Sequence, residues 1–176
     1  MAILDIVTAP NPVLEQPARV VRDDEFGPDL ERLTSDMAET MYAAPGVGLA
    51  APQIDDLRRV IVLDPGERHE RGQRFFALVN PRIIDRSEDT IPWLETCLSV
   101  PEFEIEIERT RAIEVEWQDP LDGARRSGRF EDFEAIIVQH EIDHLMGTIL
   151  LDRASRLKRS RYLKKVSKAK KNQVPA

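Results

Sequence analysis

The hydrophobic positions of this chain repeat with two different periods, and each period predicts a different kind of element. Residues 27–43 carry apolar side chains at helical spacing. These side chains are Leu30, Leu33, Met37 and Met41. Pro28 suits a first helical turn and Pro45-Gly46 ends the pattern, so one amphipathic helix is expected there.

The middle of the chain shows short apolar runs and strict alternation, as β-strands do. The predicted strands are residues 59–63, 75–79, 81–85, 91–98, 104–108 and 112–117. In EIEIE and AIEVEW every second residue is apolar, which is typical of an antiparallel strand with one face in the core. The turn sequence DPLDG, residues 119–123, is expected to connect the last of these strands to the next segment as a hairpin.

From Glu131 onward the helical period returns, and the helix is expected to end near Gly147. Its shared face carries Phe133, Ile136, Ile137, His140 and His144. Helix, strands and buried helix in that order predict an α+β fold. We expect one domain over residues 1–152 and a basic tail, residues 153–176, that forms a helix.

Composition and charge narrow the class of protein. The chain has 176 residues, 41% of them hydrophobic, and its longest aliphatic runs are far too short to span a membrane. The first ten residues lack the features of a secretory signal or transit peptide, so we expect a cytoplasmic protein with no membrane partner. The net charge is −7, yet the tail holds 10 of the 25 Lys and Arg and no acid.

The candidate chemistry begins with His140-Glu141-Ile142-Asp143-His144, which has the spacing His-Glu-x-x-His. Imidazoles at i and i+4 lie on one helical face and can bind a single metal ion, with the intervening Glu beside the open position. The alternative is that two histidines occupy a core helix by chance. The remaining histidine, His69, lies in a charged loop and is expected to be solvated.

A catalytic metal site normally has three protein ligands, so a third is needed. Asp143 points to a different helical face, although it could orient an imidazole, and Asp152 lies too far along the chain. Cys97 is the only cysteine, so it forms no internal disulfide, and it ends a predicted strand. A structural thiol is the commoner use of a lone cysteine. Beside an incomplete histidine pair, however, Cys97 is the favoured third ligand.

A thiolate and two imidazoles suit zinc, ferrous iron, cobalt or nickel. A cation bound there lowers the pKa of water toward neutrality, and Glu141 could move the proton to a leaving nitrogen. The motif therefore indicates a metal-dependent hydrolase.

Three segments resemble the motifs of the peptide deformylase family. They are GVGLAAPQ at residues 46–53, ETCLS at 95–99 and QHEIDHLMG at 139–147, and they stand in the family's order. The similarity runs from ILDIVTAPNPVL near the start to about Asp152. The resemblance implies antiparallel sheets around a central metal-bearing helix. It also implies removal of the formyl group from the N-terminal formylmethionine of nascent polypeptides, with release of formate.

Carried over by position, the resemblance makes Cys97, His140 and His144 the ligands of one divalent ion, with Fe²⁺ expected first and Zn²⁺, Ni²⁺ or Co²⁺ as alternatives. Glu141 becomes the proton carrier. The ribosome becomes a candidate partner of the basic tail, because the substrate leaves it and because basic residues contact RNA phosphates. The alternative for the tail is a solvated helix.

The resemblance also implies how the substrate is held. The side-chain amide of Gln53 and the backbone N–H of Leu98 would stabilise the oxyanion. The implied substrate-binding residues are Gly46, Val47, Gly48, Leu49 and Ile137. Phe133 and Ile136 are either walls for a methionine side chain or ordinary core residues.

Two departures from the family pattern stand out. Thr96 replaces the usual glycine of the cysteine motif, and a β-branched residue disfavours a positive φ. Asp132 stands where relatives often carry glycine. Two alternatives stay open: a deformylase-like paralogue with altered substrate or little activity because of Thr96, and, less favoured, a metalloendopeptidase.

Overall fold

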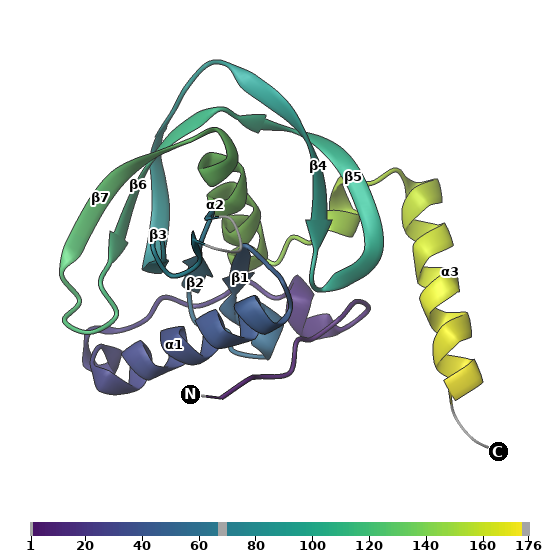
Figure 1. The fold of residues 1–176 in the computed structure, drawn as a ribbon. Coiled ribbons are helices and arrows are strands. Elements are labelled where there is room, and N and C mark those ends of the chain that lie inside the picture. The colour runs from purple at the N-terminus through teal and green to yellow at the C-terminus, as the bar shows by residue number, and fades with distance from the viewer. Residues whose placement is uncertain (1, 67–69, 174–176) are drawn as a thin grey trace.

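In the computed structural model, which describes residues 2–66 and 70–173, one helix passes between two antiparallel sheets (Figure 1). The helices are α1 (Pro28–Ala43), α2 (Asp132–Leu145) and α3 (Arg156–Gln173). The strands are β1 (Gly48–Ala50), β2 (Val60–Leu63), β3 (Phe76–Arg86), β4 (Thr90–Cys97), β5 (Val100–Thr110), β6 (Ala112–Gln118) and β7 (Arg125–Glu131). The expected α+β class and the central helix are confirmed. The expectation for His69 lies outside the described residues.

The larger sheet has the strand order β1-β2-β3-β6-β7, with every neighbouring pair antiparallel. The two strands predicted at 75–79 and 81–85 are one continuous strand, β3. Its register with β6 shifts between Val79 and Arg82, around Pro81, and Asn80 has a φ of 51°. Proline donates no hydrogen bond to a ladder, so a bulge carries the strand past it. The hairpin expected around residues 119–123 joins β6 to β7.

Strand β1 is the element that the hydrophobic pattern did not predict. It has three residues, and Gly48 pairs with Leu63 of β2. This pairing places the GVGLAAPQ segment at the edge of the larger sheet and beside α2. A three-residue strand is too short for alternation to reveal it.

The smaller sheet is the hairpin of β4 and β5. Along β5, Phe103, Ile105 and Ile107 are half-buried while the intervening glutamates are exposed, as the alternation predicted. Arg109 lies on the same inward face but is charged and not apolar. It is 6% exposed, and its partners lie on β4 and α2. The hairpin therefore covers the side of α2 opposite the larger sheet (Figure 1).

Helix α2 is buried along most of its length, which explains its apolar composition. It begins one residue later than Glu131, and Gly147 follows its end with a φ of 72°. A Cβ at Gly147 would lie 2.7 Å from the Glu15 carbonyl oxygen, so only glycine fits. The main core packs this helix against the larger sheet through residues such as Ile61, Leu78, Ile113, Val115 and Val138.

Helix α3 stands at the edge of the molecule beside the hairpin (Figure 1). Its Tyr162 is buried and meets Phe103 of β5 edge to face, with ring centroids 5.4 Å apart. Leu163 and Val166, which the sequence placed at helical spacing, join the same cluster. This short stripe anchors α3, and most of its basic side chains remain exposed. Among the described residues, no helix is long and apolar enough to cross a membrane.

Candidate metal centre

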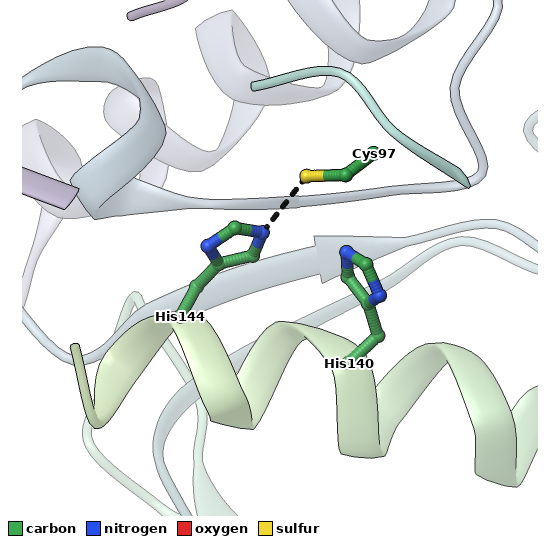
Figure 2. A group of neighbouring side chains, drawn as sticks. All are labelled: Cys97, His140 and His144. Carbon is green, nitrogen blue, oxygen red and sulfur yellow. Dashed lines mark hydrogen bonds between the residues drawn. The ribbon is translucent and has the colours of Figure 1, made fainter. Parts of the chain in front are cut away.

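Three donor side chains converge at the contact between α2 and the end of β4 (Figure 2). His140 and His144 project from the same face of α2, with ring centroids 5.1 Å apart. Cys97 Sγ lies 3.3 Å from His144 Nε2, and the donor atoms of all three residues lie within 4.8 Å of one another. One thiolate and two imidazoles at this spacing fit a single metal ion, with room for a fourth ligand.

His140 is oriented by a carboxylate that the sequence analysis quoted but gave no role. Its Nδ1 lies 2.7 Å from Glu95 Oε2. Engaging Nδ1 in this way leaves Nε2 for a metal, which is the usual arrangement around ligand histidines. Glu95 and Cys97 are two residues apart on β4, so their side chains lie on the same face of the strand. This spacing is the feature of the sequence that could have indicated a role for Glu95 beside the metal centre.

Glu95 is held in turn by a fork of two hydrogen bonds from Arg109. Arg109 Nε lies 2.6 Å from Oε1 and Nη2 lies 2.9 Å from Oε2. Burial alone would raise the pKa of Glu95, but the hydrogen bonds from Arg109 and His140 lower it to about 2. The carboxylate is therefore ionised over the physiological range and can accept a hydrogen bond from the imidazole N–H.

Asp143 acts on the centre less directly than the sequence suggested. It accepts a hydrogen bond of 2.7 Å from Arg109 Nη1 and one of 2.8 Å from Arg153 Nη2, and none from His140 or His144. Alternating charges thus run from Arg153 through Asp143, Arg109 and Glu95. Each buried charge on this path has an opposite partner.

Glu141 lies between the two histidines in sequence and is 4% exposed. Its Oε2 is buried without a hydrogen-bond partner among the described residues. Burial raises the pKa of this carboxyl group to about 7. A carboxyl group with such a pKa can both accept and return a proton near neutral pH.

Gln53 is buried beside the cysteine. Its Oε1 accepts a hydrogen bond of 2.8 Å from the Ala50 backbone N–H, which fixes the direction of the amide. Its Nε2 lies 3.1 Å from Ser99 Oγ and 3.8 Å from Cys97 Sγ. The amide donor is therefore close to Cys97, one of the three residues that could hold a metal ion.

A cleft of about 540 Å³ opens over these groups. It is lined by most of the predicted site residues, namely Gly46, Val47, Gly48, Gln53, Cys97, Leu98, Phe133, Ile136, Ile137, His140 and Glu141. Trp93 also lines the cleft, although the sequence did not point to it, and its ring centroid lies 5.2 Å from that of Phe133. No short motif marks Trp93, because it lies two residues before the ETCLS motif on β4.

Leu49 differs from the other predicted substrate-binding residues in the position of its side chain. Its side chain is fully buried against α1 and is absent from the cleft wall. Neighbouring residues of a strand point to opposite faces, so Gly48 faces the cleft and Leu49 faces the core. Only the backbone of Leu49 is therefore placed to contact a substrate, and its predicted substrate-binding role stays a prediction.

Thr96 lines the cleft from β4 and is exposed. It is not among the residues with positive φ, so its backbone conformation suits a β-branched residue. Asp132 differs, because it has a φ of 48° at the start of α2. That left-handed conformation gives a physical reason for glycine at the equivalent position of relatives.

Comparison with known proteins agrees with this geometry. The model of the polypeptide deformylase family matches residues 3–160. The peptide deformylase of Desulfotalea psychrophila is 45% identical over 168 residues, which cover 96% of this chain and 97% of that protein. The peptide deformylase of Phenylobacterium zucineum is also 45% identical, over 171 residues, with 96% and 97% coverage.

Solved structures agree as well. The crystal structure of peptide deformylase from Ehrlichia chaffeensis superposes with a TM-score of 0.87 at 33% identity, covering 97% of this chain and 98% of that one. That from Legionella pneumophila gives a TM-score of 0.86 at 34% identity, with 99% and 100% coverage. The chain therefore belongs to the peptide deformylase family, metal-dependent hydrolases that remove the N-formyl group from nascent polypeptides.

Proposed function

We propose that Cys97, His140 and His144 hold one divalent ion and that Glu141 is the general base of the deformylation. The convergence of the three donors within 4.8 Å, beside a buried carboxyl group, is the observation that carries this proposal. When bound, the ion supplies Lewis acidity and lowers the pKa of a water molecule. Fe²⁺ is the ion we propose first, and the donor set also accepts Zn²⁺, Ni²⁺ or Co²⁺.

Glu141 takes a proton from the attacking water, whose oxygen forms a bond to the formyl carbon. Negative charge then develops on the formyl oxygen, where the Gln53 amide and the Leu98 backbone N–H donate hydrogen bonds. Each such donor contributes about 3 to 4 kcal/mol to acyl-transfer reactions. The carbon–nitrogen bond breaks as Glu141 delivers the proton to the nitrogen. The products are formate and a free methionine amine.

The apolar part of the cleft receives the methionine side chain. Val47 and Ile137 line it, and the Trp93–Phe133 pair forms part of its wall. A thioether sulfur makes favourable contacts with aromatic ring edges, so this wall suits methionine. Gly46 and Gly48 line the cleft, so an extended peptide could pair with this segment as an added strand.

The basic helix α3 is proposed to contact ribosomal RNA. Its apolar stripe, centred on Tyr162, packs on β5, while side chains such as Lys158, Arg161 and Lys164 remain free to face a partner. Exposed cations on one rigid helix are suited to phosphate oxygens. The proposed ribosomal partner and the nascent substrate support a cytoplasmic location, which is part of the same proposal.

Formate release from formyl-Met-Ala-Ser by the metal-loaded protein tests the activity. We expect turnover of this peptide and none of internal peptide bonds in unformylated peptides. Cys97→Ala and His144→Ala should each lose both metal and activity, as measured by elemental analysis and formate release. Stoichiometric metal in Cys97→Ala would remove Cys97 from the site. A metal-loaded wild type that releases no formate would instead favour the inactive paralogue.

A further inference from the structure

Gly48 lies where β1 meets α2, and no feature of its own backbone requires glycine. Its φ is outside the positive range that excludes other residues, in contrast to Gly147. It sits in a regular strand opposite Leu63. An alanine could therefore adopt this backbone conformation without strain.

The space around Gly48 is the unusual feature. A Cβ built there would lie 2.9 Å from Glu141 Cδ and 2.9 Å from Ile137 Cγ2, and it would overlap Glu141 Oε1. Carbon atoms do not approach so closely without a shift of one of them. Both partners belong to α2, whose backbone is packed in the core, so the side chain of Glu141 would have to move.

Packing is also what fixes Glu141. Its Oε2 has no hydrogen-bond partner among residues 2–66 and 70–173, and the side chain is 4% exposed. Many catalytic carboxylates are oriented by hydrogen bonds from neighbouring donors. Here the surface of the Gly48 backbone and the side chain of Ile137 bound the carboxylate instead.

We propose that Gly48 is a positioning residue for the catalytic base, because its missing side chain forms the slot that holds the Glu141 carboxylate. This inference rests on the proposed role of Glu141. It differs from the role of the loop in binding peptide backbone, since it concerns the side-chain face of Gly48 toward α2. A displacement of about 1 Å in a catalytic group can cost about 100-fold in rate.

The first test is a stability cycle that does not depend on turnover. Melting temperatures are measured for the zinc-loaded wild type, Gly48→Ala, Glu141→Ala and the double variant. Gly48→Ala should lower the melting temperature by about 3–10 °C when Glu141 is present, as overpacking does. It should lower it by less than half as much in the Glu141→Ala background, where the carboxylate is gone. Equal losses in both backgrounds would overturn the proposal.

The same set of four proteins also tests the proposal if Gly48→Ala fails to fold. If Gly48→Ala does not fold, the double variant should fold, because the contacts with the carboxylate have been removed and only the contact with Ile137 Cγ2 remains. Failure of both variants would show that Gly48 is needed for a reason unrelated to Glu141. That outcome would overturn the inference and leave the proposed function standing.

The second test uses kinetics on formyl-Met-Ala-Ser. Gly48→Ala should lose about 10- to 100-fold in kcat while keeping one metal per chain. Gly46→Ala is the matched variant, since its Cβ would meet the flexible end of Leu98, Cδ1, at 2.9 Å, and its effect should fall mainly on KM. Glu141→Asp should reduce kcat less in the Gly48→Ala background than in the wild type. Multiplicative losses, or a normal kcat for Gly48→Ala, would refute the positioning role. An inactive wild type would instead refute the proposed function.

Discussion

Glu95 Oε2 and His140 Nδ1 lie 2.7 Å apart, although 45 residues separate them in the chain. The same carboxylate accepts two hydrogen bonds from Arg109, and both charged side chains are buried. A proposed metal ligand is thus oriented by an ion pair inside the protein. Such outer partners usually matter nearly as much as the ligands themselves.

Glu95→Gln should weaken the metal site and the fold together. We expect metal affinity to fall about 10- to 100-fold, because His140 loses its charged acceptor. We also expect a loss of about 3–5 kcal/mol in the free energy of unfolding, because Arg109 keeps a buried charge without its main partner. Chelator competition and urea denaturation measure the two effects. Glu104→Gln, on the exposed face of β5, is the control, and a Glu95 variant that matches it would contradict the assignment.

Glu141→Gln should separate metal binding from chemistry. The amide keeps the size of the side chain but cannot accept the proton, so kcat should fall by about two to four orders of magnitude. Metal content should stay at one ion per chain, since Glu141 is not among the three converging donors. Elemental analysis beside formate release decides the point. Loss of the metal in this variant would make Glu141 a ligand.

Thr96→Gly tests whether this side chain obstructs the substrate. Thr96 is exposed on the cleft wall, so its removal should raise kcat/KM for formyl-Met peptides, more for a tetrapeptide than for a dipeptide. Metal content should not change, and added backbone freedom should cost up to about 1 kcal/mol of stability. Thr90→Gly, at the far end of the same strand, controls for that cost. No gain at either peptide length would refute the obstruction.

Asp132 offers a test of backbone strain at the start of α2. With φ at 48°, Asp132→Gly should be about 1 kcal/mol more stable than Asp132→Ala. Both variants lack the carboxylate that pairs with Arg111, so their difference isolates the backbone term. Urea denaturation gives the two free energies. An alanine variant as stable as the glycine variant would show that no strain resides at this position.

Tyr42 should set an alkaline limit to stability. Burial and the hydrogen bond that it donates to Asp64 raise the pKa of Tyr42 from 10.0 to about 12. The folded state therefore favours the protonated phenol. The resulting stability is fully present below pH 10 and is lost as the pH rises from about 10 to 12.

Ultraviolet titration of tyrosinate measures this directly, because the chain has only two tyrosines. Burial also raises the pKa of Tyr162, so neither phenol should ionise at its ordinary pH in the folded protein. In Tyr42→Phe the ionisation near pH 12 should disappear and the alkaline loss of stability should shrink. A tyrosine that ionises near pH 10 in the wild type and is absent from the variant would contradict this.

The spacing of residues within single helices and strands determined several features of the fold and of the candidate metal centre. The i, i+4 histidines need only a helix to share a face, and Glu141 follows from the same helix geometry. Strict alternation was enough to predict β5 and β6 with their buried faces. Such features depend on neighbours within one element, so the sequence alone could reveal them.

The tertiary structure decided what depends on contacts between distant segments. It brought Glu95 to His140 and placed Gly48 against Glu141, pairs that no periodicity connects. It also placed the side chain of Leu49 in the core. The register in which β1 pairs with β2 decides which face of the sheet each side chain of β1 occupies. Which distant surfaces meet depends on the packing of the whole chain, and no local pattern contains that information.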